Sequence, residues 1–190
     1  MTERTMDDGG RRTRGWRIAV WSVAALMLLA PLVAMRFTDE VNWDETDFIV
    51  FGAMLTAACG TFELAARRTG DLSHLAAVAV AVGAAFLLVW INLAVGIIGS
   101  EDHPANLLFV GVLATGVVGA LLVRARPGGM ARVMAATASA QALVGAVAVA
   151  AGWGAAGPIW PREILALTGF FTAAWLLSGW LFRRAAAKAR

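Results

Sequence analysis

The stretch LAAVAVAVGAAFLLVWINLAVGIIG, Leu75 to Gly99, carries no charged side chain and only one amide, Asn92. A helix that crosses the hydrocarbon core of a bilayer needs about 20 apolar residues, because each residue advances the helix by about 1.5 Å. The stretch meets that length and lacks the strict alternation of a membrane β-strand. It therefore predicts a transmembrane helix.

The composition of the whole chain agrees with this interpretation. Of its 190 residues, 59% are hydrophobic and 15% are charged, and the mean hydropathy is +0.71. A soluble globular protein of this composition would lack the polar surface needed to cover itself. The charged residues also gather in short segments between long uncharged runs, as expected if each run lies in lipid. We therefore exclude a soluble globular protein.

Six runs are long enough to span a membrane, and their backbone hydrogen bonds must be satisfied internally, as in a helix. We expect spans at 18–35, 48–66, 75–99, 107–123, 133–153 and 164–182. The predicted fold is an all-α, polytopic helix bundle over residues 16–183. Basic cytoplasmic tails are expected at 1–15, which we expect to be disordered, and at 184–190. A cleaved signal peptide is the alternative for the first span, but its apolar core of about 18 residues exceeds a typical signal sequence.

The basic residues predict the orientation of the spans. With six spans, all but Arg36 and Arg162 of the 16 Lys and Arg residues fall on one face of the membrane. By the positive-inside rule that face is cytoplasmic, so both termini are expected in the cytoplasm of a bacterium, with the chain in its cytoplasmic (inner) membrane. Anionic lipid at this face is an expected partner, at about 1 kcal/mol per basic residue near the surface.

Three polar residues within the spans are candidate sites: Glu63, Asn92 and Gln141. Glu63 precedes Arg67 by one helical turn, which favours an ion pair, and a proton or cation relay is the alternative. For Asn92 we expect a hydrogen bond to another helix, with substrate coordination as the alternative. At 1.5 Å per residue, the three lie about 5, 25 and 12 Å from the cytoplasmic boundary, so they do not converge on one small ligand.

The predicted outer face is rich in carboxylates. Its candidate residues for an interaction or a cation are Asp39, Glu40, Asp44, Glu45, Asp47, Glu101, Asp102 and His103. Three interpretations stay open: a solvated loop that caps helices, a docking surface for a partner, and a Ca²⁺ or Mg²⁺ site without EF-hand spacing. Asn106 is expected to cap the fourth span.

The sequence offers little for catalysis. His74 and His103 are predicted on opposite sides of the membrane, and Cys59 is the only cysteine, which excludes an intrachain bis-histidine haem site, disulfide and thiolate cluster. No G-x-S-x-G, H-E-x-x-H or P-loop motif occurs. We expect no enzyme, no catalytic or metal-binding residue and no cofactor.

A shift of 59 residues indicates an internal repeat. It superposes Gly52 on Gly111, Thr56 on Thr115 and Gly60 on Gly119. Such a Gly and Thr row permits close approach of a neighbouring helix. Because Gly and Ala are abundant in this chain, chance agreement remains the alternative.

The motif WINLAVGIIGSEDHPAN, Trp90 to Asn106, together with VNWDETDF and the Arg-rich turn at 124–132, resembles a group of uncharacterised bacterial multispanning membrane proteins. The resemblance covers the chain from Phe37 to Trp153. It implies a bacterial cytoplasmic membrane and brings no assigned activity.

Two functions are consistent with these residues. The first is a non-enzymatic accessory or scaffold subunit, which contacts other membrane proteins or a second copy through helix faces and the acidic outer loop. The second is a small proton- or cation-linked transporter or channel. No nucleic-acid partner is expected.

Overall fold

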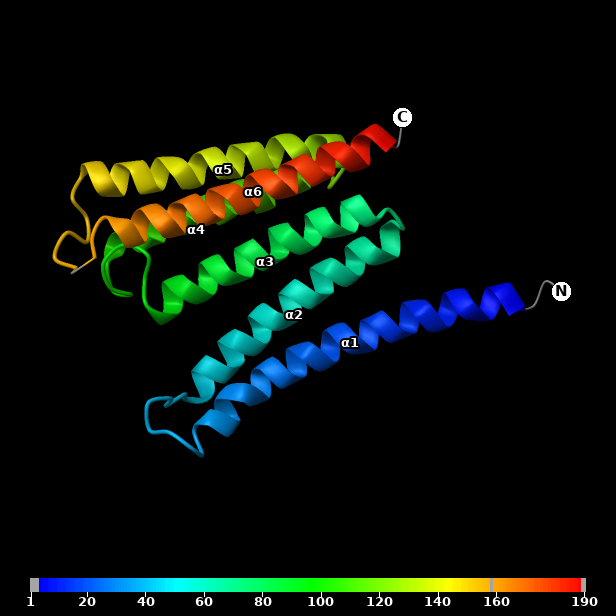
Figure 1. Ribbon diagram of the computed structural model, residues 1–190, viewed down its shortest axis with the longest axis horizontal. Helices are drawn as coiled ribbons and strands as arrows, with labels where there is room; N and C mark the ends of the chain where they lie inside the picture. Colours follow the sequence, from blue (N-terminus) through cyan, green and yellow to red (C-terminus); the bar gives the residue numbers. More distant parts are fainter. Residues whose placement is uncertain (1–3, 158, 189–190) are drawn as a thin grey trace. The chain divides into compact units, whose positions relative to one another are not determined.

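The computed structural model describes residues 4–157 and 159–188, with side chains from residue 17 onward. These residues contain helices and no strand, so the all-α prediction is confirmed. The elements are α1 (Arg4–Ala34), α2 (Glu45–Arg68), α3 (Leu72–Ala94), the 3₁₀ helix η1 (Pro104–Leu107), α4 (Leu108–Leu122), α5 (Pro127–Ala150) and α6 (Arg162–Lys188) (Figure 1).

Within the described residues, six helical segments are long and apolar enough to cross a membrane, as predicted from the sequence. They lie at 17–34, 45–68, 72–94, 104–122, 127–150 and 162–188, and one of them joins η1 to α4. The chain thus has the build of a multi-pass membrane protein.

Several helix ends differ from the predicted spans. α3 ends at Ala94 rather than at Gly99, because Gly96 and Gly99 adopt φ angles of +71° and +69° that break the helix. α1 is longer than the predicted first span. It begins at Arg4 and so includes most of the segment 1–15, which we expect to be a disordered tail. Adding a residue to an existing helix costs far less than starting one, so helices extend past their apolar cores.

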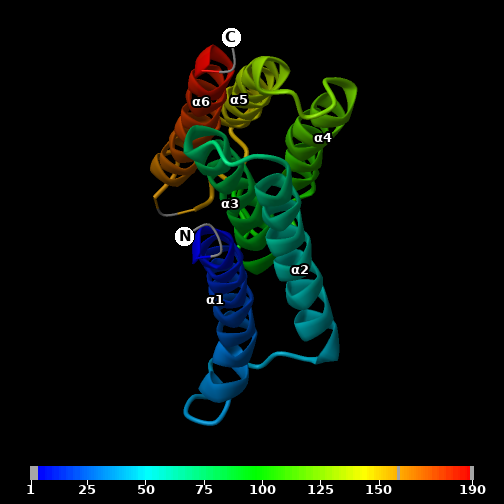
Figure 2. The same cartoon turned by 90° about the vertical axis from the view of Figure 1, so that its right-hand side faces the viewer.

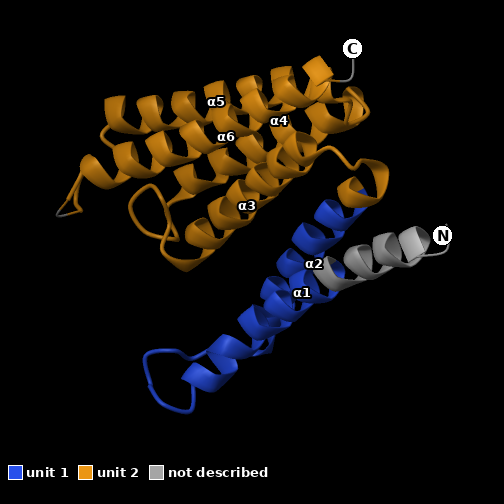
Figure 3. Ribbon diagram, turned by 45° about the vertical axis from the view of Figure 1, so that its right-hand side comes forward, with its two compact units in different colours: residues 1–64 blue, residues 65–190 orange. Residues whose placement is uncertain are grey.

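The chain divides into two compact units, Met1–Leu64 and Ala65–Arg190, called unit 1 and unit 2 here (Figure 3). Unit 1 contains α1 and most of α2. At Gly52, an added Cβ would lie 3.8 Å from the side chain of Leu28, so α1 and α2 are close to each other at this position. The ring of Trp43 packs edge-on against Phe48 and Phe51, at centroid distances of 5.2 and 5.3 Å, and fixes the start of α2.

Unit 2 is a four-helix arrangement in which α5 packs against both α4 and α6, and α6 packs against α3 (Figures 1 and 2). Its interior is built from large apolar side chains that are almost wholly buried, among them Leu88, Val112, Phe171 and Phe182. In lipid such packing and interhelical hydrogen bonds hold helices together, because the hydrophobic effect does not favour one apolar surface over another.

Glycines set the register of α5 against α6. An added Cβ at Gly145 would lie 2.4 Å from the Thr168 side chain, and one at Gly179 would lie 3.2 Å from the Cβ of Met134. Both pairs are separated by 11 residues on each helix, in opposite chain directions. The two helices are therefore antiparallel, and the absence of a side chain at these glycines permits their close contact.

Asp71 joins the start of α3 to the end of α6. Its carboxylate accepts the backbone N–H of His74 at 2.8 Å and lies 3.4 Å from Nζ of Lys188, which also donates to Ser73 Oγ at 2.9 Å. The backbone N–H and then the ammonium group hold the pKa of Asp71 below its usual value.

This shift gives a pH-dependent prediction. A carboxylate with a lowered folded-state pKa stabilises the fold above its unfolded-state pKa of about 3.9, and this contribution is lost as the pH falls through the folded-state pKa. We expect Asp71→Asn to lower the melting temperature at pH 7, and we expect its difference from the unmodified chain to shrink as the pH falls below about 3.9. Thermal unfolding in detergent measures both. Asp102→Asn is the control, since within the described residues its carboxylate accepts no hydrogen bond.

Candidate functional site

Glu63 lies inside unit 1, where it is 8% exposed, and residues of α1 bind it. Its Oε1 is 2.7 Å from the guanidinium of Arg17, and its Oε2 accepts the indole N–H of Trp21 at 2.9 Å. A buried carboxylate is costly unless it is paired and hydrogen-bonded, and these two partners meet that requirement. They lie more than 40 residues away in sequence, so the spacing rule that indicated Arg67 could not identify them.

The variant Glu63→Gln tests how much the negative charge of Glu63 contributes to the stability of the fold. Gln keeps an oxygen that accepts the Trp21 N–H but loses the ion pair with Arg17. Since the Arg17 side chain is 46% exposed, we expect a loss of about 1 kcal/mol rather than the larger cost of a fully buried pair. Denaturant titration in mixed micelles measures it. A double-mutant cycle with Arg17→Gln should show coupling, and simple additivity would contradict the pairing.

Asn92 and Gln141 both lie in unit 2. Asn92 was expected to bind another helix, and this prediction is wrong: its Nδ2 donates to Leu88 O of its own helix at 2.8 Å. A carbonyl one turn back is within reach of a short amide side chain, whereas the Oδ1 atom of Asn92 is buried without a hydrogen-bond partner among the described residues. Gln141 is fully buried, and neither its Oε1 nor its Nε2 has a hydrogen-bond partner among the described residues.

Gln141 is level with a row of polar groups on α6. The register set by Gly145 places Gln141 opposite Thr172, one turn from Thr168 and from Trp175. The hydroxyls of both threonines and the indole N–H of Trp175 are also buried and without a partner among the described residues. We call Gln141, Thr168, Thr172 and Trp175 the polar row. The sequence pattern had indicated only Gln141.

Asn106 does not cap α4, contrary to the prediction. Its Oδ1 accepts the backbone N–H groups of Ile97 and Ile98 at 3.2 and 2.9 Å, and its Nδ2 donates to the carbonyls of Ile98 and Ser100 at 3.3 and 2.7 Å. One amide thus satisfies four polar backbone groups where the chain leaves α3. As a result Ile97 and Ile98 are buried in the core, although they lie outside a helix.

The loop that follows α5 packs against the loop that follows α3. An added Cβ at Gly154 would lie 2.8 Å from the N atom of Gly99, so the two backbones are in direct contact. The ring of His103, one of the candidate outer residues, lies 6.4 Å from that of Trp153, and its Nδ1 accepts the N–H of Ala105 at 3.2 Å. His103 therefore caps η1, and its acceptor nitrogen is occupied.

The other outer candidates are divided between the units, with Asp39 to Asp47 in unit 1 and Glu101 to His103 in unit 2. Asp44 and Asp47 cap the start of α2 reciprocally, each carboxylate accepting the other's backbone N–H at 3.0 Å. These two hydrogen bonds agree with the interpretation of the loop as one that caps a helix. Among the described residues, no three His, Cys, Asp or Glu side chains are grouped so that they hold a metal ion.

The two copies of the indicated repeat share one detail and differ in another. Thr56 and Thr115 each donate to the carbonyl four residues earlier, at 2.8 Å in both cases. An added Cβ at Gly119 would lie 2.6 Å from Val133, whereas Gly60 and Gly111 have no neighbour within 4 Å. Close helix approach thus occurs at Gly119 and is absent at those two positions.

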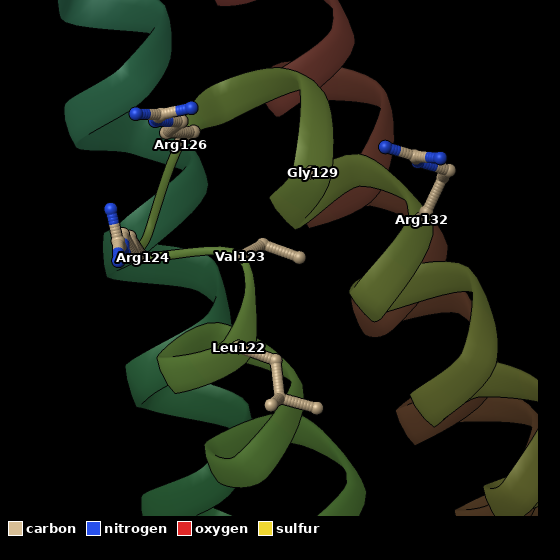
Figure 4. A pocket seen from close by; sticks show the side chains of 6 residues that line it. All are labelled: Leu122, Val123, Arg124, Arg126, Gly129 and Arg132. Carbon is tan, nitrogen blue, oxygen red and sulfur yellow. The ribbon is translucent and has the colours of Figure 1, made fainter.

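The turn between α4 and α5 forms a basic pocket (Figure 4). After α4 the chain turns through Arg124 and Ala125, with φ angles of +52° and +53°, and Arg126 is extended, as is usual before a proline. Pro127 then starts α5. The pocket has a volume of about 430 Å³ and is lined by Leu122, Val123, Arg124, Arg126, Gly129 and Arg132. The sequence had indicated these arginines only as markers of orientation.

Comparison of the chain with protein families, with curated proteins and with solved structures finds no match.

Proposed function

We propose that this chain is a non-enzymatic accessory or scaffold subunit of a bacterial cytoplasmic membrane, with both termini in the cytoplasm. The observation that carries this proposal is the pairing of Glu63 with Arg17 and Trp21. A proton or cation relay needs a carboxylate whose charge is available to the transported ion. Here the charge is balanced within the same helical hairpin, which supports an architectural role.

The other polar residues support the same role. Asn106 binds loop backbone, Asp44 and Asp47 bind each other, and Ser178 donates to Ala77 O at 2.9 Å to join α6 to α3. Each of these groups is used within the chain, unlike the groups of the polar row, which have no partner among the described residues. Surfaces for partners are then the open face of α4 around Gly111 and the exposed acidic residues of the loop before α2 that take no part in capping, such as Asp39 and Glu40.

Crosslinking in the native membrane tests the scaffold proposal. A photoreactive residue at position 111 should give a discrete crosslinked product of defined mass. The triple variant Asp39→Asn, Glu40→Gln, Glu45→Gln should weaken recovery of the same product. The control, Glu101→Gln with Asp102→Asn, should leave it unchanged. Crosslinks to lipid alone would overturn the proposal.

A small transporter or channel is the second candidate, and the polar row favours it. A passing water, proton or cation needs polar groups along its path, and these buried groups have no partner among the described residues. Proteoliposomes loaded with a pH-sensitive dye test this, with a K⁺ or pH gradient as the driving force. Flux above that of empty liposomes, abolished by Gln141→Leu, would replace the scaffold proposal. A flux equal to that of empty liposomes would support the scaffold proposal.

Orientation is tested separately by cysteine labelling in a Cys59→Ala background. Glu101→Cys should react with a membrane-impermeant maleimide in intact spheroplasts, and Ala125→Cys should react only after lysis. The expected difference follows from the distribution of Lys and Arg residues between the loops. The reverse labelling pattern would place the termini outside the cytoplasm.

A further inference from the structure

The pocket at the α4–α5 turn brings three arginines together around one cavity. Arg124 and Arg126 come from the turn and Arg132 from the second turn of α5 (Figure 4). Its volume of about 430 Å³ exceeds that of a phosphate group many times, so a substituted phosphate fits. The apolar residues Leu122 and Val123 also line the cavity.

The positive charge of this pocket is not balanced locally. Within the described part of the chain, no carboxylate forms an ion pair with Arg124, Arg126 or Arg132. Like charges that line one cavity repel one another, and an anion between them turns this repulsion into attraction. A guanidinium group also presents paired N–H donors that match the oxygens of a phosphate.

The start of α5 also borders the pocket, through Gly129. Arg126, the residue that precedes α5, makes no side-chain hydrogen bond to the start of the helix, and Pro127 carries no N–H. The N–H groups of Gly128 and Gly129 belong to the first turn, which has no intrahelical acceptor. Gly129 leaves room for the side chain of Val123, which an added Cβ would approach to 2.6 Å, and a helix start favours negative charge.

We propose that this pocket binds the phosphate of an anionic phospholipid headgroup. The apolar surroundings favour a lipid over free phosphate, because Leu121 and Leu122 are 73% and 79% exposed beside the arginines. These side chains offer contact to an acyl chain whose headgroup lies in the pocket, whereas inorganic phosphate would gain nothing from them. The inference depends neither on the scaffold proposal nor on the orientation of the chain.

Native mass spectrometry of the detergent-solubilised full chain tests the proposal, with phosphatidylglycerol and phosphatidylcholine titrated separately. We expect about tenfold tighter binding of phosphatidylglycerol, as for a charge-assisted headgroup contact. The pocket variant Arg124→Gln with Arg132→Gln should abolish this preference. A matched control, Arg68→Gln with Arg183→Gln, removes the same charge from two other exposed arginines and should keep it. The conservative variant Arg124→Lys with Arg132→Lys should keep part of it.

Each outcome decides the matter. Loss of the preference in the pocket variant alone supports the proposal. Equal loss in both Gln variants means diffuse attraction to basic residues and overturns it, as does a preference that survives in the pocket variant. A third titration uses inorganic phosphate: if it binds with the same arginine dependence while the two lipids bind equally, the lipid assignment is overturned. Helix content and elution volume are compared first, and if the Gln variant fails to fold, the Lys variant and Arg132→Gln replace it.

Discussion

Asn106→Ala should lower the free energy of unfolding by about 3–5 kcal/mol, because it leaves buried backbone groups without partners at about 1–3 kcal/mol each. Those groups are the N–H of Ile97 and Ile98 and the carbonyl of Ile98, and the partly buried carbonyl of Ser100 also loses its donor. Ile97 and Ile98 should then leave the core, and trypsin or thermolysin should cut this loop in detergent micelles. Denaturant titration measures the loss of stability, and limited proteolysis locates it.

The matched control for this prediction is Asn92→Ala. Its amide donates one hydrogen bond, to a carbonyl of its own helix at 2.8 Å, and Ala is a better helix former than Asn. We expect a change below about 1 kcal/mol. Equal losses in the two variants would show that Asn106 does not hold the loop through its hydrogen bonds.

Gly145→Val should destabilise unit 2 by about 2–4 kcal/mol, since overpacking at a tight helix contact forces backbone shifts or strained rotamers. The first added carbon would lie 2.4 Å from the Thr168 side chain, which is β-branched and has little freedom to move away. α5 and α6 would have to separate. Denaturant titration in mixed micelles gives the size of the effect.

Gly111→Val serves as the control for Gly145→Val. It introduces the same side chain in the middle of α4, where an added Cβ meets nothing within 4 Å. We expect a change within about 0.5 kcal/mol, as for substitutions away from packed sites. A comparable loss at both positions would mean that the cost reflects helix propensity rather than contact with α6.

The class of the protein followed from the sequence alone. Long apolar runs such as 75–99 identified the helices that are able to span a membrane, because transfer into lipid depends on the summed hydrophobicity of consecutive residues. Helix ends were harder to predict. Hydrophobicity does not report where a helix stops, so the end of α3 at Ala94 was missed.

The candidate sites were predictable only as residue types. Glu63 was identified as an intramembrane carboxylate, but its partners Arg17 and Trp21 lie on another helix. Asn106 was assigned the nearest helix end, whereas it binds a loop 6 to 9 residues earlier. Local rules indicate only partners that are near in sequence, whereas the packing of the chain also brings together residues that are far apart in it.

The sequence by itself determined that this chain is helical and suited to lipid, since both properties are sums over neighbouring residues. Only the tertiary structure decided which glycines lie at close helix contacts, which amide holds the loop after α3, and which three arginines share a cavity. These three features depend on contacts between residues that are far apart in the sequence. Such contacts form only when the helices and loops pack against one another.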